Sequence, residues 1–411
     1  MADTTSGADS GPRRAGARRR VLFIGEGSTL AHAARPLALA AALPPDRFQA
    51  VVALPERYHR WIPPGLERRT LDAQSPASFA ARLRSGRPLF SAARLADYFE
   101  QDVRLIHEVR PDVVVGDFRL SLAASARATQ TPYITISNAY WSPDRPLRPV
   151  RPALAALEHW PWPLAEAAFR LAAPMALVRA AAPVDRLLTE HGLEPIDKDV
   201  RRAFTDADLT LWADIPALYP DLEDTADRRF LGPVPWEPET PAPPWWSEVP
   251  RGRPVAYLTL GSSGEPGLAG RLAGWLRGLG FVVLAASAGR NDIATGEDGV
   301  FVAEYLPGLA AAARSDIVVC NGGAPTSAQA LLAGRPVLGV CSNMDQFLNM
   351  RAVQQAGAGL ALRADSVGPG AFQRALGRLA DPRFERAAAV VSQSAHACDA
   401  AATLATAIEG F

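Results

Sequence analysis

A histidine and an aspartate, each following a strand-like run, could together carry out acid–base chemistry. His32 lies at the start of a helical pattern that follows the run 21–24, and Asp117 ends the run 113–117. A carboxylate that accepts a hydrogen bond from a neutral imidazole fixes its tautomer and stabilises its protonated form, as a general base requires. From spacing alone, His32 could equally be a cap or packing residue, and Asp117 could cap the next helix.

A second group of chemically capable residues lies in the loop that follows the strand-like run 317–320. Asn321, Gly322 and Gly323 begin this loop, and Thr326 lies three residues further on. The glycines let the backbone approach a ligand closely, while Thr326 supplies a hydroxyl and an N–H group at a helix start. Because N–H groups at a helix N-terminus favour anions without any cation, the pattern predicts a phosphate site. A tight strand-to-helix turn without a ligand is the alternative.

The elements around these residues alternate between short β-branched runs and longer Ala, Leu and Arg segments of helical period. This alternation is typical of stacked βαβ units with a parallel sheet. The spacing of Leu95, Phe99, Val103 and Ile106 predicts a helix that ends at Arg110-Pro111. The strand-like runs form two sets, namely 21–24, 49–54, 113–116, 133–137 and 209–212, then 255–260, 281–286, 300–303, 317–320 and 337–340.

A proline-rich stretch separates the two sets of strands, and its composition suits neither a helix nor a central strand. The expected fold class is therefore α/β, with two doubly wound, Rossmann-like domains that face each other across a cleft. Ligands of such folds bind beyond the carboxyl ends of the strands. We predict a disordered tail at 1–19, a first domain at 20–229, a linker at 230–252 and a second domain at 253–411, whose last helix could pack back on the first domain.

Composition excludes several classes of protein. Lys198 is the only lysine in the chain and no Gly-rich loop adjoins it, so a Walker A site, a pyridoxal Schiff base and a protein-kinase ATP lysine are not expected. The 43 basic and 43 acidic residues cancel, which argues against a nucleic-acid partner. The three cysteines form no CxxC pair, and the Asp-x-Asp sequences at 197–199 and 206–208 lie in charged surroundings, so neither a metal nor a cofactor is expected.

The sequence also shows neither a membrane-spanning stretch nor a signal peptide. No apolar stretch reaches the roughly 18 residues that span a bilayer, and the Arg-rich N-terminus has no apolar signal-peptide core. We therefore expect a cytoplasmic protein without stable membrane insertion. The sequence gives no indication of its oligomeric state.

The second loop and the residues after it resemble the GT-B glycosyltransferases of the macrolide and UDP-glucuronosyltransferase type, which move sugars from nucleotide diphosphates to small acceptors. The family pattern is His-Gly-Gly-x-Gly-Thr, then Ala-Gly-x-Pro-x-Leu, then Asp-Gln-x-x-Asn. The resemblance covers nearly the whole chain after the tail and implies the GT-B fold. The matching positions are Gly322, Gly323, Thr326, Ala333-Gly334, Pro336, Asp345-Gln346 and Asn349.

The resemblance also implies a donor site in the second domain. Gly261, Ser262 and Ser263 look like the family's Gly-Ser turn beside the donor diphosphate. Asp345 and Gln346 would bind hydroxyls of the donor sugar, because a carboxylate accepts hydrogen bonds while an amide both donates and accepts. By the same resemblance, a further position, Tyr305, would lie near the nucleotide base, although it could equally be a core residue.

Two positions depart from the family pattern. Asn321 replaces a histidine that reaches the diphosphate, and Gln329 stands where many relatives place a glutamate on the ribose. These changes leave the donor nucleotide open. They also support an alternative function, in which a non-catalytic scaffold of the same fold binds a nucleotide or a partner protein. A nucleotide-sugar epimerase is a further alternative, although it does not require the Asp345-Gln346 pair.

In the first domain, the resemblance makes His32 the general base that removes the acceptor's proton, with Asp117 as its partner. His32 stands in a sequence similar to the family's Gly-His helix start, with Ala31 in the glycine position. We therefore expect an inverting, metal-independent glycosyltransferase that uses a UDP- or dTDP-sugar as co-substrate.

The acceptor prediction comes from a tryptophan-rich segment that breaks the strand-helix alternation. Trp141, Trp160 and Trp162 could line a pocket for a small apolar or aromatic natural product, although large aromatic side chains usually pack in a core. A helix over 164–179 could instead touch a membrane surface, but Pro174 is expected to interrupt it.

Overall fold

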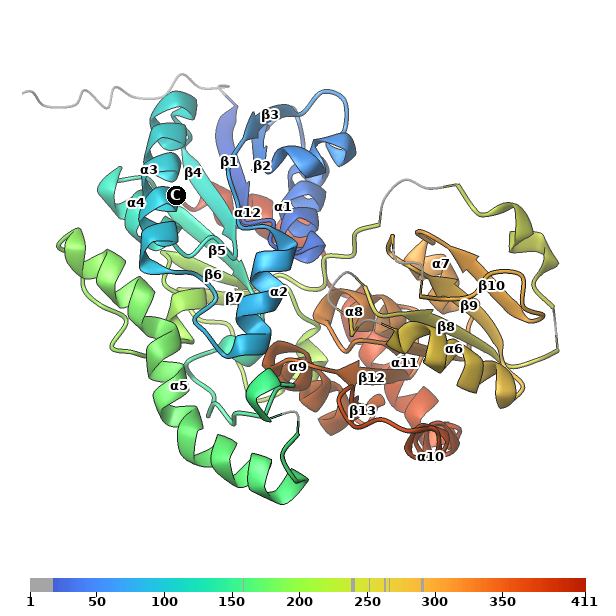
Figure 1. Ribbon diagram of the computed structural model, residues 1–411. Coiled ribbons are helices and arrows are strands. Elements are labelled where there is room, and N and C mark those ends of the chain that lie inside the picture. The colour runs from blue at the N-terminus through green and yellow to red at the C-terminus, as the bar shows by residue number, and fades with distance from the viewer. Residues whose placement is uncertain are drawn as a thin grey trace, which may run out of the picture.

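The computed structural model describes residues 18–157, 159–237, 241–250, 252–261, 264–265, 267–289 and 292–411. Within these residues the chain forms two sheets, each covered by helices and each in its own lobe (Figure 1). All neighbouring strands described in both sheets are parallel. The predicted fold class of two doubly wound α/β domains is confirmed.

The first sheet has the strand order β3-β2-β1-β4-β5-β6-β7. The chain winds outwards from β1 to β3, then crosses back to place β4 on the other side of β1. The switch point, where such sheets bind ligands, therefore lies between β1 and β4. The strands are β1 Arg19–Gly25, β2 Phe48–Leu54, β3 Glu67–Thr70, β4 Val113–Asp117, β5 Tyr133–Ser137, β6 Leu209–Trp212 and β7 Arg228–Phe230.

The second sheet repeats this winding, with the order β10-β9-β8-β11-β12-β13. Its switch point lies between β8 and β11. The strands are β8 Val255–Thr259, β9 Val282–Ala286, β10 Val300–Ala303, β11 Ile317–Cys320, β12 Val337–Cys341 and β13 Gly359–Arg363.

The helices follow from the apolar periodicity and its end signals, as α3 (Ala92–Val109) illustrates. The side chain of Ser91 caps its N-terminus, and Arg110 ends it in the left-handed region with φ 49°. Leu95 and Phe99 are buried on its inner face, so the predicted helix and its end are confirmed. The other helices are α1 Leu30–Ala42, α2 Pro76–Ser85, α4 Leu122–Ala128, α5 Trp162–Glu190, α6 Leu268–Gly278, α7 Gly308–Ala313, α8 Ala324–Leu332, α9 Met344–Gln355, α10 Pro369–Leu379, α11 Pro382–His396 and α12 Ala400–Glu409.

The last helix, α12, returns to the first domain and lies beside α1 (Figure 1). Leu404 and Ile408 are buried in the same core cluster as Phe23 of β1.

In the proline-rich stretch, the indole N–H of Trp245 donates to a carbonyl oxygen of β10 at 3.3 Å. The two domains are thus joined by α12 as well as by the chain that follows β7.

The prediction that Pro174 interrupts the helix after Trp162 was wrong, because α5 contains both Pro174 and Pro183. A proline inside a helix removes the hydrogen bond to the carbonyl group four residues earlier. Those carbonyl groups belong to Arg170 and Arg179, which are both exposed residues. Water can therefore satisfy them, and the helix continues.

Candidate active site

His32 and Asp117 meet at the switch point of the first sheet. Strands β1 and β4 pair so that Gly25 lies opposite Asp117, and α1 carries His32 in its first turn. His32 Nδ1 lies 2.8 Å from Asp117 Oδ1, and the side chain of Asp117 is fully buried. The ring of Phe118 stacks on the imidazole with 4.1 Å between centroids. When Nδ1–H donates to the carboxylate, Nε2 is the nitrogen that can accept a proton.

Gly25 lets α1 approach the sheet closely enough for this contact. A Cβ at this position would overlap the carbonyl oxygen of His32 and the side chain of Leu54. That carbonyl also lies four residues before Pro36, which has no N–H to donate to it. The start of α1 is thus fitted to the end of β1, and this fit positions His32.

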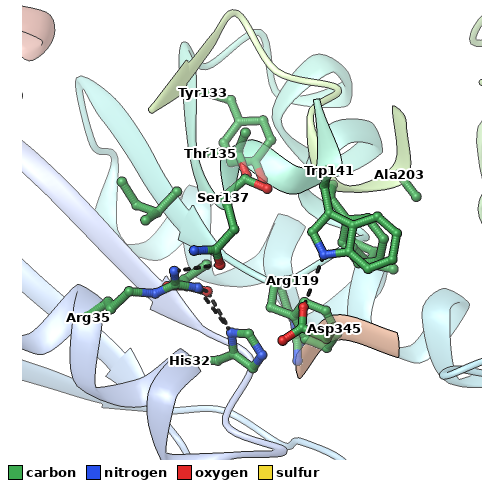
Figure 2. A pocket seen from close by; sticks show the side chains of 15 residues that line it. His32, Arg35, Arg119, Tyr133, Thr135, Ser137, Trp141, Ala203 and Asp345 are labelled. Carbon is green, nitrogen blue, oxygen red and sulfur yellow. Dashed lines mark hydrogen bonds and ion pairs between the residues drawn. The ribbon is translucent and has the colours of Figure 1, made fainter. Parts of the chain in front are cut away.

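Arg35 lies one turn after His32 and binds the same carboxylate (Figure 2). Its Nε donates to Asp117 Oδ2 at 2.6 Å, and its Nη2 donates to Asp117 Oδ1 at 2.9 Å. Burial by itself would lower the pKa of Arg35, but the adjacent carboxylate outweighs it and the pKa is raised. Asp117 is therefore shared between an imidazole and a guanidinium group, which fixes the orientation of both.

Two further polar residues extend this network, and sequence analysis singled out neither. Arg35 Nη1 donates to Asn138 Oδ1 at 3.0 Å, and Asn138 Nδ2 donates to Asp214 Oδ1 at 3.1 Å. Burial raises the pKa of Asp214 to about 6, although hydrogen bonds from Ala139 N–H and Asn138 oppose the rise. The line of contacts thus runs from His32 back to a buried carboxylic acid after β6.

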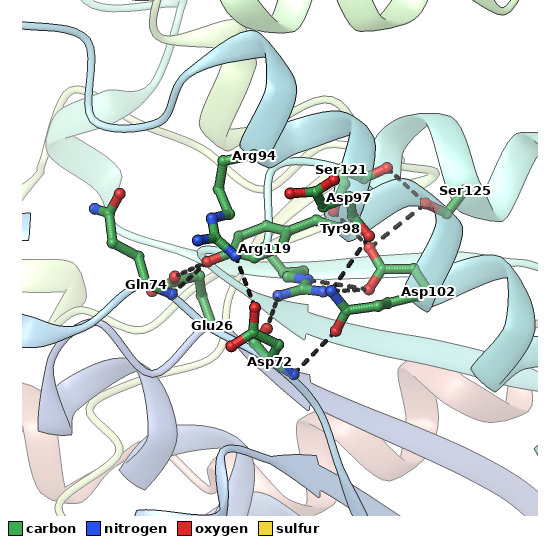
Figure 3. A network of polar contacts seen from close by, with 11 residues as sticks. Glu26, Asp72, Gln74, Arg94, Asp97, Tyr98, Asp102, Arg119, Ser121 and Ser125 are labelled. Atoms are coloured by element: carbon green, nitrogen blue, oxygen red, sulfur yellow. Dashed lines mark hydrogen bonds and ion pairs between the residues drawn. The ribbon is translucent and has the colours of Figure 1, made fainter. Parts of the chain in front are cut away.

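A separate buried network supports the loop between β1 and α1 (Figure 3). The carboxylate of Glu26 is fully buried and accepts from Ser28 N–H at 2.6 Å and from the Tyr98 hydroxyl at 2.8 Å. Arg119 lies over the ring of Tyr98 at 3.5 Å and donates from Nε to Asp102 at 3.0 Å. Burial raises the pKa of Tyr98, so its hydroxyl stays protonated and can donate to Glu26.

The pocket beside His32 is lined by residues of both domains, which contact each other there (Figure 2). Trp141 follows β5, and its Nε1–H donates to Oδ1 of Asp345, in the first turn of α9, at 3.1 Å. The ring of Phe204 packs against Trp141 at 4.7 Å between centroids. The cavity volume is about 30 Å³, which is room for water-sized groups only. Trp141 and Asp345 therefore line the same pocket as His32.

At the switch point of the second sheet, the glycine-rich loop joins β11 to α8. Gly322 has φ +81°, and a Cβ there would lie 2.6 Å from Cys341 Sγ, so the position requires glycine. Asn321 Oδ1 accepts from Gly323 N–H at 3.0 Å. Gly261 follows the neighbouring strand β8, and a Cβ on it would lie 3.7 Å from Asn321 Nδ2. The structure thus brings the two predicted diphosphate loops side by side.

Thr326 lies in the first turn of α8 and is partly exposed. The two serines predicted beside Gly261, Ser262 and Ser263, lie outside the described residues. Asn349, a further motif position, is buried and donates to the carbonyl oxygen of Gly322 at 2.8 Å. It therefore stabilises the glycine-rich loop from α9.

Gln346 has a structural role that the sequence analysis did not anticipate. It forms a capping box with Asn343, in which each side chain accepts from the other residue's backbone N–H group. Its Oε1 also accepts from Ser342 N–H at 2.8 Å, and the residue is 2% exposed. The side-chain oxygen of Gln346 therefore stabilises the start of α9, which leaves the amide N–H groups for any sugar hydroxyl.

Tyr305 and Gln329 lie near the chain that connects the domains. Tyr305 packs edge-on against Trp61 of the first domain with 6.5 Å between centroids. Trp61 contacts Trp236 at 5.4 Å, and Gln329 Nε2 donates to the carbonyl oxygen of Trp236 at 3.4 Å. Both predicted nucleotide contacts thus adjoin one aromatic cluster between the domains.

The structure does not bring Trp160 and Trp162 to the pocket beside His32. They are 51% and 49% exposed at the start of α5. The guanidinium groups of Arg151 and Arg363 lie over the ring of Trp162, at 4.6 and 5.0 Å from its centroid. After β5 the chain crosses towards the second domain, where Arg363 donates to the carbonyl oxygen of Arg151. This path carries both tryptophans away from the predicted acceptor position.

An aspartate of each Asp-x-Asp sequence forms an ion pair with an arginine. Asp199 contacts Arg201 at 2.6 Å, and Asp206 contacts Arg127 at 2.6 Å. Among the described residues, no group of three or more His, Cys, Asp and Glu side chains has the arrangement of a metal site.

Comparisons with known proteins agree with this architecture. Residues 280–408 match the family model described as Erythromycin biosynthesis protein CIII-like, C-terminal domain. The PGL/p-HBAD biosynthesis glycosyltransferase of Mycobacterium tuberculosis is 41% identical over 365 residues, which cover 89% of this chain and 85% of that protein. The PGL/p-HBAD biosynthesis rhamnosyltransferase of Mycobacterium bovis is 43% identical over 358 residues, which cover 87% of this chain and 80% of that protein.

Among solved structures, the spinosyn rhamnosyltransferase SpnG superposes with a TM-score of 0.69 over 94% of this chain and 99% of its own, at 18% sequence identity. That protein has also been solved with thymidine diphosphate and with spinosyn aglycone. At this identity the likeness shows the shared fold.

Proposed function

Since this chain belongs to the GT-B glycosyltransferases of the macrolide and UDP-glucuronosyltransferase-like type, we propose that it transfers a sugar from a nucleotide diphosphate to a small acceptor by a single inverting displacement. The observation that carries the proposal is the pocket shared by His32 and Asp345. One domain supplies a base and the other a carboxylate that can bind sugar hydroxyls, so both substrates meet between them.

His32 Nε2 takes the proton of the acceptor as the acceptor atom attacks the anomeric carbon. The bond between that carbon and the diphosphate breaks, and the nucleoside diphosphate leaves. Asp117 accepts from Nδ1–H throughout and stabilises the imidazolium ion that forms, while Arg35 holds the carboxylate in place. Loss of such a base typically lowers the rate by about 10²- to 10⁴-fold.

The donor diphosphate lies against the glycine-rich loop and the N-terminus of α8. Backbone N–H groups there and the amide of Asn321 donate to its oxygens, so binding requires neither a lysine nor a metal. Asp345 exchanges its hydrogen bond from Trp141 for hydroxyl groups of the sugar. A thymidine diphosphate sugar is the first donor to test, because one relative is named a rhamnosyltransferase and SpnG was solved with thymidine diphosphate.

The acceptor lies against aromatic rings of the first domain. Phe118, Phe204 and Trp141 line the pocket beside His32. Aromatic rings gain from offset stacking as well as from burial, so a flat apolar or aromatic acceptor fits this lining.

Mass spectrometry of reactions that combine UDP- or dTDP-sugars with aromatic and lipid-like acceptors tests this function. We expect a product heavier by one sugar residue, release of free nucleoside diphosphate, and an anomeric configuration, read from proton NMR couplings, opposite to that of the donor. Activity should persist in EDTA. Tight nucleotide binding without release under any acceptor would instead support the non-catalytic scaffold.

A further inference from the structure

Helix α5 presents apolar side chains on the side that faces away from the protein. Leu171 is 85% exposed, Met175 63% and Leu164 58%. They are spaced i, i+7 and i+11, and therefore share one face of the helix. Buried residues such as Ala173 and Val184 lie on the opposite face. Figure 1 shows α5 along one edge of the first domain, with its outer side away from the sheet.

Two tryptophans lie at the N-terminal end of α5, where Trp162 projects from the side opposite Leu164 and has Arg151 and Arg363 over its ring. Trp160 and Trp162 are each about half exposed. We call Trp160, Leu164, Leu171 and Met175 the outer α5 surface. Only one side of α5 is buried in this chain. Exposed apolar patches such as the outer α5 surface mark sites of contact with a protein or a membrane.

The residues around the outer α5 surface are basic, although the whole chain is neutral. Residues 144–186 contain six arginines against two aspartates and two glutamates, and Arg170 pairs with Glu166 at 3.3 Å. The side chain of Arg170 is 77% exposed, and Arg179 is also an exposed residue. Helix α2 lies against the short turn 155–157 just before Trp160, and it adds exposed Arg84 and Arg87 in a stretch, 76–90, without acidic residues.

We propose that the outer α5 surface docks the protein on an anionic lipid bilayer, with α5 lying in the plane of the interface. Exposed leucine and methionine enter the acyl boundary, Trp160 sits at the headgroup level, and arginines bind anionic headgroups, as in other interfacial helices. This surface does not include His32 or Asp345, so docking is independent of sugar transfer.

Two other uses of α5 fit the structure less well. By length and composition α5 could cross a membrane, but its side with Ala173, Ala181 and Val184 is packed on the first domain, which would have to enter the bilayer with it. A two-fold contact between copies places the same surface on both sides, so it would bring Arg170 and Arg179 towards their own counterparts. An anionic surface neutralises these arginines.

Vesicle flotation of the full-length protein tests the docking. Phosphatidylcholine vesicles with and without phosphatidylglycerol would be compared for the wild type, Leu171→Glu/Met175→Glu and Arg170→Glu/Arg179→Glu. Val390→Glu is a matched control, because Val390 is 62% exposed on α11 outside this surface. We expect the wild type and Val390→Glu to float with the anionic vesicles. The apolar variant should bind about tenfold or more weakly, and the arginine variant should lose the preference for phosphatidylglycerol.

Two further measurements on soluble protein keep the result independent of folding defects. Vesicles with brominated acyl chains should quench the fluorescence of the wild type, and quench Trp160→Phe less. Size-exclusion chromatography with light scattering should give the same mass for the wild type and Leu171→Glu/Met175→Glu. Equal flotation of these two proteins would overturn the proposal. So would a lipid-free dimer that this double substitution dissociates.

Discussion

Replacing Asp117 by asparagine should impair stability and activity for two different reasons. The buried carboxylate of Asp117 accepts two hydrogen bonds from Arg35 and one from His32. Asparagine keeps one oxygen but presents N–H groups to these donors. The guanidinium group of Arg35, which is itself buried, then has no carboxylate beside it.

The stability change can be estimated from this ion pair. Removing one partner of a buried pair costs about 3–5 kcal/mol. With about 2–4 °C per kcal/mol for a domain of this size, the melting temperature of Asp117→Asn should fall by roughly 6–20 °C. The double variant Asp117→Asn/Arg35→Met carries no unpaired charge and should recover most of that loss. Its sugar transfer should nevertheless stay about 10²- to 10⁴-fold below the wild type, because His32 still lacks its carboxylate.

Thermal melts followed by circular dichroism, together with rates of nucleoside diphosphate release, separate these effects. His32→Ala is the matched control, since it leaves the contact between Arg35 and Asp117 in place. It should lose activity with a melting temperature close to that of the wild type. The reasoning fails if Asp117→Asn melts with the wild type, or if the double variant regains activity.

Three further substitutions test other contacts. Trp141→Phe removes the indole N–H that occupies Asp345, so calorimetry should show several-fold tighter binding of a nucleotide sugar and unchanged binding of the nucleoside diphosphate; weaker sugar binding would contradict this exchange. Gly322→Ala forces a Cβ onto Cys341 at positive φ, which should lower the free energy of unfolding by about 2–5 kcal/mol in urea titrations and weaken nucleotide binding; wild-type values for both would contradict it. The pKa of Asp214, raised to about 6 from 3.8, means that its contribution to stability is complete below about pH 4 and is lost as pH rises through 6. Urea titrations should therefore show a loss of up to about 3 kcal/mol over this range that Asp214→Asn lacks; equal pH slopes in the two proteins would be the contrary result.

The elements of this fold could be predicted because each strand and helix has its own local pattern. Buried parallel strands are continuous apolar runs, and helices such as α3 carry both a cap and a stop signal. The strand order has no such local signal, because it depends on which strands pair. It is this order that places β4 beside β1, and therefore Asp117 beside His32.

In the candidate site, too, sequence patterns identified some residues and missed others. His32 and Asp117 were selected from sequence and lie in contact, whereas their catalytic roles stay a prediction. The sequence analysis did not single out Arg35, although its spacing from His32 places both on one helix face. The capping box of Gln346 also had a local signal, an asparagine three residues before a glutamine.

Trp160 and Trp162 show where residue type is misleading. A tryptophan-rich segment suggested either a pocket lining or a core, because large aromatic side chains are usually buried. Their exposure is set by the path of the chain after β5, which leads to α5 at the edge of the molecule. No pattern within the segment encodes that path.

A single-turnover measurement with saturating donor and acceptor tests the central claim, that His32 is the base for sugar transfer. Rapid quenching would follow formation of the glycosylated product by the wild type and by His32→Ala. We predict that His32→Ala binds the nucleotide donor as the wild type does, but forms product about 10²- to 10⁴-fold more slowly. Equal single-turnover rates for the two proteins would contradict the claim.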